Sequence, residues 1–349
     1  MTNKFANKGV LVGISGGVDS AVCCMLLRDA GYEVQGLYCI MSENHLLGVE
    51  SARTTAHELG IALHIADLRE QFKASVIIPF TDAYSTGRTP NPCVLCNPYV
   101  KFRSLADTAA SLGAYSIASG HYARITDLNG YKVIEKASDK ARDQSYMLYR
   151  LEQKILAKLI LPLGLKSKTE VRALAGEAGL SSSLRPDSQE ICFAPDGDYI
   201  EYMHSLSLYG KKGSFLSPDG ENMGSHKGVE FYTVGQRRGL CLNTGRPVFV
   251  KRILENGDIL LAYSGDEYAR QVTVDRLSLN PAFDLGSENK LEVKLRSAAK
   301  PAKACISPND DGTLELAFFE PQRAPAPGQS AVLYKGDLLV GGGFIVDFA

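Results

Sequence analysis

A six-residue stretch near the amino terminus, Ser15 to Ser20, reads Ser-Gly-Gly-Val-Asp-Ser and has the composition of a phosphate-binding turn. An apolar run that is typical of a buried strand precedes it (10–14), and an amphipathic stretch that predicts a helix follows it (20–30). Unpaired backbone N–H groups and the helix dipole attract anions at such a junction, and glycine lets a phosphate approach the backbone. The stretch lacks the Lys of a Walker loop. We therefore predict a phosphate site of another type, with a turn that binds no ligand as the alternative.

Asp19 is the acidic residue of this turn. A carboxylate among phosphates requires a cation between them, so Asp19 is a predicted Mg²⁺ ligand. The same residue can cap the helix, and the two roles are compatible.

Three cysteines lie in polar, proline-rich sequence. Cys93 and Cys96 have a spacing that brings two sulfurs close enough for a disulfide, a metal site or a sulfur relay, and Cys192 adds a third thiol if the fold joins its loop to theirs. We expect the nearby Arg88, Lys101 and Arg185 to lower the thiol pKa values. Separate, incidental cysteines are the alternative.

Composition places the chain among globular proteins. Its 349 residues include 45% hydrophobic and 22% charged ones, no apolar run is long enough to span a membrane, and residues 1–8 are too polar for a signal peptide. We expect a cytoplasmic protein without a structural disulfide framework. The net charge is −1, but residues 205–252 carry eight Lys or Arg against three acids, as a phosphate-binding face or a solvated surface would.

The pattern along the chain predicts an α/β fold. Strand-like and helical stretches alternate up to about residue 120, which favours a doubly wound parallel sheet with ligands at the carboxyl ends of its strands. We expect a loop over 86–98, because three prolines exclude a regular helix, and helices over 144–158 and 168–179. Short β-like runs follow, and those after 272 suggest a small antiparallel barrel. The predicted parts are a catalytic domain (1–204), a small central domain (205–271) and a C-terminal β-barrel (272–349).

These residues resemble the tRNA-specific 2-thiouridylase family (MnmA/TrmU) of the PP-loop ATP pyrophosphatases, whose fold is like that of the adenine nucleotide α-hydrolases. The resemblance runs nearly end to end. Its blocks are the Ser-Gly-Gly-Val-Asp-Ser turn, Gly87 to Asn97, Lys101-Phe102, Ser119 to Tyr122, Asp143 to Tyr146, Pro186 to Phe193, Gly235 to Leu240, Pro327 to Ala331 and Gly341 to Gly343.

The resemblance implies an ATP-dependent sulfurtransferase that adenylates the wobble uridine of tRNA (U34) and replaces its 2-oxygen by sulfur, releasing AMP and pyrophosphate. Cys192 would carry a persulfide, and Cys96 would be the nucleophile that releases the sulfur by forming a disulfide with Cys192. Residues that match nucleotide-binding positions are Gly13, Ile14, Ser15, Gly16, Gly17, Val18, Asp19, Ser20, Cys39 and Gly120. Asn91, Pro92 and Cys93 would face the target base, and the tRNA contacts would be His121, Arg142, Asp143, Gln144, Arg296, Ser297 and Gln329. His121 can instead be a hydrogen-bonding residue at a strand end, and Gln329 a turn residue.

Two departures from the better-known members affect the mechanism and the partners. Cys93 stands where they have Asp, and the chain has no Trp where they carry an Asn-Trp pair. Three thiolates could hold a [4Fe-4S] cluster through Cys93, Cys96 and Cys192, with the fourth iron binding hydrosulfide. The expected partners are tRNA and a sulfur donor, either a cysteine desulfurase or a relay protein, and neither DNA nor a membrane. The rival functions are another PP-loop ligase or amidotransferase, and a sulfur or iron–sulfur carrier that binds tRNA without modifying it.

Overall fold

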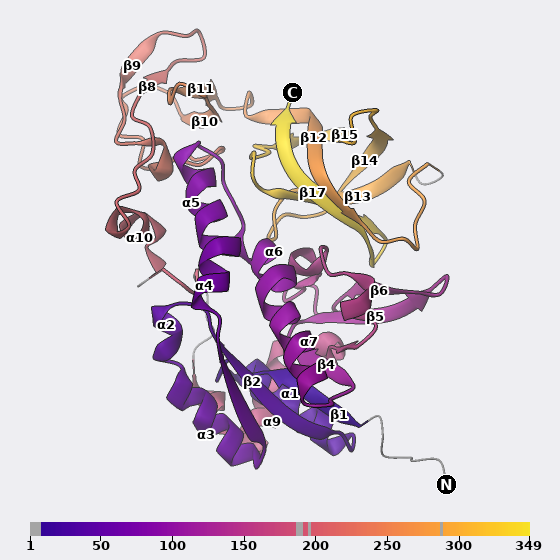
Figure 1. Cartoon of the computed structure of the whole chain (residues 1–349). Coiled ribbons are helices and arrows are strands. Elements are labelled where there is room, and N and C mark those ends of the chain that lie inside the picture. Colours follow the sequence, from indigo (N-terminus) through magenta and orange to yellow (C-terminus); the bar gives the residue numbers. More distant parts are fainter. Residues whose placement is uncertain (1–7, 186–190, 195–196, 287–288) are drawn as a thin grey trace.

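The computed structural model describes residues 8–185, 191–194, 197–286 and 289–349, which fold around three sheets (Figure 1). The first sheet is parallel, with the strand order β3-β2-β1-β4-β7. Its strands are β1 (Gly9–Gly13), β2 (Glu33–Ile40), β3 (Ala62–Asp67), β4 (Ser116–Ser119) and β7 (Leu159–Ile160).

Helices cover both faces of this sheet. Val10 and Val12 of β1 pack with α1 (Val18–Asp29), α3 (Val49–Leu59) and α9 (Lys168–Glu177), whereas Leu11 faces α7 (Phe102–Ser111). The alternation follows from the two-residue period of a strand, and burial on both faces explains why β1 is apolar throughout. The doubly wound α/β prediction is confirmed.

One of the remaining helices directly precedes β7, at the amino edge of the sheet, and the others lie near the carboxyl edge or beyond it. They are α2 (Glu43–Leu46), α4 (Arg69–Phe72), α5 (Ile78–Ser85), α6 (Pro92–Cys96), α8 (Gln153–Leu156) and α10 (Tyr199–Ser205). Two π-helical turns, Lys73–Ile77 and Asn97–Lys101, join α4 to α5 and α6 to α7. None of the described helices combines the length and the apolar character that crossing a membrane requires.

Two local predictions were wrong. Within the predicted loop 86–98, α6 forms because Asn91 caps it by accepting from the Cys93 N–H at 3.1 Å, and because Pro92 stands in the first turn, where no N–H is needed. The predicted helix 144–158 is a 3₁₀ turn followed by the short α8. There the Tyr146 hydroxyl donates to the Ser330 carbonyl, so contacts with the barrel override the helical pattern.

The C-terminal part is a closed antiparallel barrel, as predicted. Among the described residues, six strands close through the pairing of β12 with β17. The hairpin of β5 and β6 extends this sheet from the α/β part, since β6 pairs with β17. The strands are β5 (Ala123–Leu128), β6 (Tyr131–Lys136), β12 (Tyr268–Leu279), β13 (Lys290–Lys294), β14 (Ala302–Pro308), β15 (Leu314–Arg323), β16 (Ser330–Lys335) and β17 (Leu338–Phe348).

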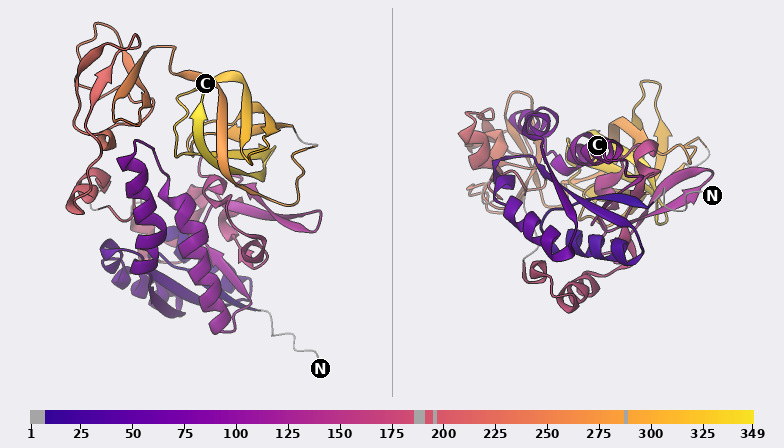
Figure 2. Two further views of the ribbon diagram at one scale, coloured as in Figure 1. Left: turned by 45° about the horizontal axis from the view of Figure 1, so that its top comes forward. Right: turned by 60° about the horizontal axis from the view of Figure 1, so that its bottom comes forward.

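The central part carries a separate small sheet, in the order β10-β11-β8-β9. Its strands are β8 (Ser214–Leu216), β9 (Asn222–Ser225), β10 (Val248–Ile253) and β11 (Ile259–Tyr263). This sheet and the barrel lie side by side beyond α5 and α6, on the far side from most of the parallel sheet (Figure 2).

Candidate active site

The Ser15–Ser20 turn links β1 to α1 at the carboxyl edge of the parallel sheet. Gly16 has a φ of 77°, and a Cβ there would lie 2.9 Å from the Cβ of Ser51, so both conformation and space require glycine. Ser20 Oγ donates to the Gly17 carbonyl at 2.9 Å and accepts from the Ser15 N–H at 3.2 Å. The hydroxyls thus brace the turn while the first amides of α1 point out of the helix end.

Asp19 is held by two residues that the sequence did not single out. Lys168 Nζ lies 2.8 Å from both carboxylate oxygens, and the Tyr122 hydroxyl donates to Oδ1 at 2.7 Å. The helix cap is Gly17, so Asp19 does not cap α1. Lys168 opens α9 behind a capping box formed by Ser167 and Glu170. That box is readable in the sequence, but nothing local connects residue 168 with residue 19.

The predicted nucleotide-binding residues come together at the ends of β1, β2 and β4. Gly120 follows β4, and a Cβ there would lie 2.8 Å from the carbonyl carbon of Asp19. Cys39 is half-buried near the end of β2, and burial raises its pKa. The structure therefore places Gly120 against the Ser15–Ser20 turn and Cys39 near the carboxyl end of the adjacent strand, the edge at which parallel sheets bind ligands.

The two cysteine loops also meet. Cys96 is buried, with Sγ 3.7 Å from Met41 Sδ, in the same apolar cluster as Phe193. Phe193 packs edge-on against Phe72 and Phe80, with ring centroids 5.6 and 5.2 Å apart, which fixes the chain beside Cys192. The pKa of Cys192 is influenced by Cys93, so the three thiols share one region. Residues 186–190 of the same motif lie outside the described residues.

All eight cysteines are free thiols, so no Cys96–Cys192 disulfide is present in this structure. Burial raises the pKa of Cys96 to about 12, and desolvation by neighbouring protein atoms raises that of Cys192, whose surface is exposed, to about 11. The surface of Cys93 is exposed, yet neighbouring protein atoms desolvate its thiol and raise its pKa as well. The thiol pKa values are raised overall, because desolvation outweighs the nearby positive charge that was expected to lower them.

Of the three cations expected to act on the thiols, Lys101 does so. Its charge opposes the pKa increase at Cys93, Cys96 and Cys192, although burial is the larger effect. The π turn Asn97–Lys101 explains the placement. In an α-helix, residues five apart lie roughly 140° apart around the axis, whereas i→i+5 bonding brings them to one side. The other two cations lie elsewhere: Arg185 donates to the Gly16 carbonyl at 2.9 Å, and Arg88 lines a cavity.

The thiols do not fit a preformed iron–sulfur site. Within the described ranges, no three His, Cys, Asp or Glu side chains are arranged to hold a metal ion. Cys96 is buried, whereas Cys93 and Cys192 are exposed. As placed, these three residues do not provide the converging ligands of a [4Fe-4S] cluster. Asp19, in turn, already accepts from Lys168 and Tyr122, and its 34% exposed side chain leaves part of the carboxylate open for Mg²⁺.

The three residues predicted to face a base lie at the amino end of α6. Asn91 and Pro92 are half-buried and Cys93 is exposed, while the Asn91 side chain serves as the helix cap. Gln329 of the barrel donates to the Thr89 carbonyl at 2.9 Å, which ties this loop to the barrel.

Most other predicted RNA contacts have partners within the protein. His121 Nδ1 lies 2.9 Å from Ser119 Oγ, which matches the alternative of a strand-end residue, and burial together with Lys101 lowers its pKa to about 3. Asp143 accepts from the Ala137 and Ser145 amides, Gln144 from the Tyr122 amide, and Arg296 donates to the Val234 and Ala324 carbonyls. Arg142 is exposed and Ser297 is half-buried.

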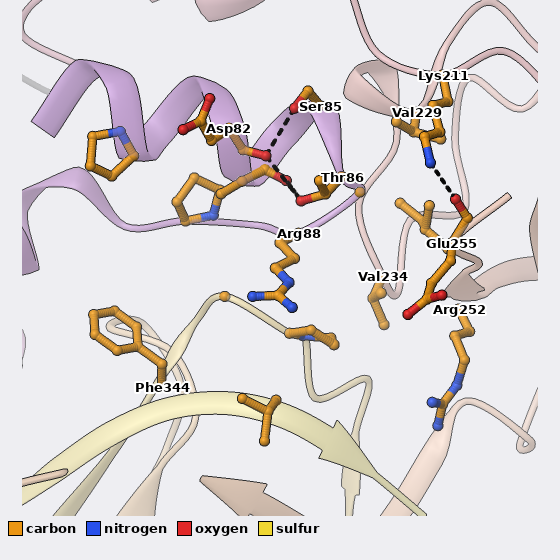
Figure 3. A pocket seen from close by; sticks show the side chains of 18 of the residues that line it. Asp82, Ser85, Thr86, Arg88, Lys211, Val229, Val234, Arg252, Glu255 and Phe344 are labelled. Atoms are coloured by element: carbon orange, nitrogen blue, oxygen red, sulfur yellow. Dashed lines mark hydrogen bonds between the residues drawn. The ribbon is translucent and has the colours of Figure 1, made fainter. Parts of the chain in front are cut away.

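A cavity of about 860 Å³ lies between the α5–α6 connection, the central sheet and the barrel (Figure 3). Four cations line it: Arg88, Lys211, Arg252 and Arg276. Figure 3 shows the Arg88 side chain extending into the space, whereas Lys211 donates to the Glu255 carbonyl at 2.7 Å. Two of the four come from the basic segment 205–252, so part of that segment's charge faces this open cavity.

Comparisons with known proteins cover nearly the whole chain. Residues 8–196 match a family model described as the tRNA methyl transferase HUP domain, residues 205–262 one described as its PRC-barrel domain, and residues 270–345 one described as an aminomethyltransferase beta-barrel domain. The tRNA-specific 2-thiouridylase MnmA of Clostridium acetobutylicum is 39% identical over 97% of this chain and 99% of its own length. The protein of the same name from Acetivibrio thermocellus is 40% identical over 97% and 99%.

The solved structures to which the chain has a weaker similarity include the U34-tRNA thiolase NcsA from Methanococcus maripaludis with its [4Fe-4S] cluster. It is 19% identical, with a TM-score of 0.36, and the match covers 59% of this chain and 70% of that one.

Proposed function

Because this chain belongs to the tRNA-specific 2-thiouridylase family, we propose that it is an ATP-dependent sulfurtransferase that converts the wobble uridine of tRNA into 2-thiouridine. One observation carries the proposal beyond family membership. A phosphate-binding turn and three thiols, distant in sequence, occupy the same end of one sheet. ATP must activate the same uridine base that receives the sulfur, so the turn and the thiols must both lie next to that base.

The first step is adenylation of the base. The 2-oxygen of uridine attacks the α-phosphorus of ATP, the bond to the bridging oxygen breaks, pyrophosphate leaves, and the N3 proton passes to solvent. The turn from Ser15 to Ser20 would hold the departing pyrophosphate through backbone N–H groups. Mg²⁺, when bound, would supply further positive charge at the phosphates. Gly120, which borders the turn, and Cys39, near the end of the adjacent strand β2, would contact the nucleotide.

The second step is sulfur transfer. A persulfide on Cys192 attacks C2 of the base through its outer sulfur, and AMP leaves with the former 2-oxygen. Cys96 then attacks Cys192 Sγ, the bond between Cys192 and the transferred sulfur breaks, and a Cys96–Cys192 disulfide remains while N3 regains a proton. The cycle needs a persulfide donor, such as a cysteine desulfurase or a relay protein, and a thiol reductant. The shared packing of Cys96 and Phe193 supports this pairing.

The raised thiol pKa values fit a site that is inactive until its substrates arrive. With pKa values of about 12 and 11, Cys96 and Cys192 are protonated at neutral pH. The positive charge of Lys101 lowers both pKa values and would favour the thiolate forms of Cys96 and Cys192 once the base is in place. We derive no step through an iron–sulfur cluster, because the described thiols do not fit one.

The RNA would enter between the three parts of the chain, which we propose to be divided at residues 204 and 271. Arg88, Lys211, Arg252 and Arg276 line the cavity there, and phosphate contacts from such cations position an RNA without reading its sequence. Asn91, Pro92 and Cys93 would face the everted base. Of the predicted RNA contacts, exposed Arg142 fits a direct contact, whereas Arg296 and Gln329 would act by holding the loops that form the RNA-binding face. Eight free thiols support a reducing, cytoplasmic setting.

The decisive experiment is mass analysis of nucleosides from unmodified tRNA incubated with the protein, Mg·ATP and sulfide under anaerobic conditions, with and without reconstituted iron. We expect ATP-dependent 2-thiouridine without added iron, its loss in Cys192→Ser, and normal activity in the control Cys305→Ser, whose thiol lies in the barrel. A strict iron requirement would refute the persulfide route. AMP formation without any thiolated nucleoside would indicate another PP-loop ligase, and tRNA binding without AMP would indicate a carrier.

A further inference from the structure

Lys168 lies at the start of α9, directly opposite the phosphate-binding turn. The Ser167 side chain accepts from the Glu170 amide, and Glu170 accepts from the Ser167 amide in return, which fixes where α9 begins. Val171 and Ala175 of α9 pack in the same core as the buried face of α1. Two rigid helices therefore set the position of Lys168 relative to Asp19.

The contact between them is close and largely shielded from solvent. Lys168 Nζ lies 2.8 Å from both Oδ1 and Oδ2 of Asp19, the lysine side chain is 11% exposed, and Tyr122 adds a third hydrogen bond to Oδ1. Asp19 itself is 34% exposed, so one side of the carboxylate faces the space above the turn. The ammonium group of Lys168 is thus held at the amino end of α1, where the helix dipole already favours anions.

A second cation lies on the same turn. Arg185 Nη1 donates to the Gly16 carbonyl at 2.9 Å, while the Arg185 carbonyl accepts from Arg172. Arg185 therefore binds the backbone of the turn directly, whereas Lys168 contacts the turn through the carboxylate of Asp19. Exchange of one carboxylate oxygen for a phosphate oxygen would cost Lys168 little, because both are charged acceptors of similar geometry.

We propose that Lys168 is the phosphate-binding cation of this turn, and that Asp19 positions it there in addition to any contact with Mg²⁺. The proposal deepens the proposed function and rests on it, since it assigns a residue to the pyrophosphate released by adenylation. Lys168 donates to a pyrophosphate oxygen while the Tyr122 hydroxyl continues to hold Asp19. The turn then binds pyrophosphate even without a divalent ion.

The test uses inorganic pyrophosphate and the full-length protein in isothermal titration calorimetry, with Mg²⁺ and with EDTA. We expect Lys168→Met to weaken binding at least tenfold in both conditions, which corresponds to about 1.4 kcal/mol. Lys168→Arg should stay within about threefold of the wild type. The matched control is Lys166→Met: Lys166 is two residues away and lies 3.9 Å from Glu170 in a solvent-exposed pair, so its loss should leave binding unchanged.

The proposal is overturned if Lys168→Met binds pyrophosphate as tightly as Lys166→Met, or if its loss appears only with Mg²⁺. Should Lys168→Met not fold, a crystal structure of the wild type with pyrophosphate decides: a phosphate oxygen within hydrogen-bond distance of Lys168 Nζ supports the proposal, and its absence refutes it. Pyrophosphate binding requires neither tRNA nor sulfur. A wild type that binds pyrophosphate through Lys168 but forms no 2-thiouridine would therefore refute the proposed function alone.

Discussion

Replacing Gly120 by Ala tests whether contact between the end of β4 and the Ser15–Ser20 turn shapes the proposed nucleotide site. A Cβ at this position would lie 2.8 Å from the Asp19 carbonyl carbon, 2.9 Å from its oxygen and 3.0 Å from the Ser20 nitrogen. Favourable separations between nonbonded carbons are about 3.5–4.0 Å. All three obstructing atoms belong to the backbone, so no side chain can rotate away, and the end of β4 must move from α1 by several tenths of an ångström or more.

The cost follows from this overlap. Overpacking a core typically costs about 1–3 kcal/mol. Because the new Cβ belongs to one backbone segment and all the atoms it meets belong to another, the cost belongs in the upper part of that range, at about 2–3 kcal/mol. The corresponding decrease in Tm is about 4–12 °C for a domain of this size. Because Asp19 and Ser20 shift as well, AMP formation should fall by about 10- to 100-fold, the upper figure being the effect of a misplacement of about 1 Å.

The assays are differential scanning calorimetry and tRNA-dependent AMP release, with Gly176→Ala as the control. Gly176 lies in α9, and a Cβ there would meet nothing within 4 Å. Alanine should therefore raise stability by about 0.5–1 kcal/mol and leave AMP release unchanged. If Gly120→Ala retains both its Tm and its rate, the close approach of β4 to the turn does not shape the site.

Three further outcomes are expected. Alkylation of Cys192 by iodoacetamide should accelerate about tenfold per pH unit from pH 7 to pH 10, because its pKa of about 11 keeps the thiolate scarce; a plateau near pH 8 in rate profiles from mass spectrometry would contradict this. His121 has a folded-state pKa of about 3, below its unfolded value, so the stability it confers is complete above about pH 6.5 and lost as the pH falls; at pH 4 the loss is about 3 kcal/mol. Urea unfolding at pH 7 and 4 should show this loss in the wild type but not in His121→Asn. Finally, Cys93→Asp should form 2-thiouridine at a rate within about threefold of the wild type and without bound iron; loss of activity together with iron would assign Cys93 to a cluster instead.

Local sequence was sufficient where the chemistry is local. The order of apolar run, glycine pair and amphipathic run identified the turn from Ser15 to Ser20, because strand period, glycine freedom and helix start signals each act over a few residues. The same reasoning predicted the parallel sheet and the barrel. It failed at Pro92–Cys96, where prolines were read only as helix breakers although Pro92 stands in a first turn. It failed again at 144–158, where Tyr146 is anchored on the barrel.

Tertiary structure decided everything that depends on residues meeting across the fold. Asp19 and Lys168 are 149 positions apart and form one ion pair, and only the packing of α9 on α1 brings them together. The pKa values of Cys96 and Cys192 show the same dependence, since the sequence shows the nearby cations but not the desolvation that outweighs them. The sequence by itself determined which groups could do the chemistry, because short-range patterns specify residue types and local geometry. Burial and long-range contact, which set charge state and partners, exist only once the chain has folded.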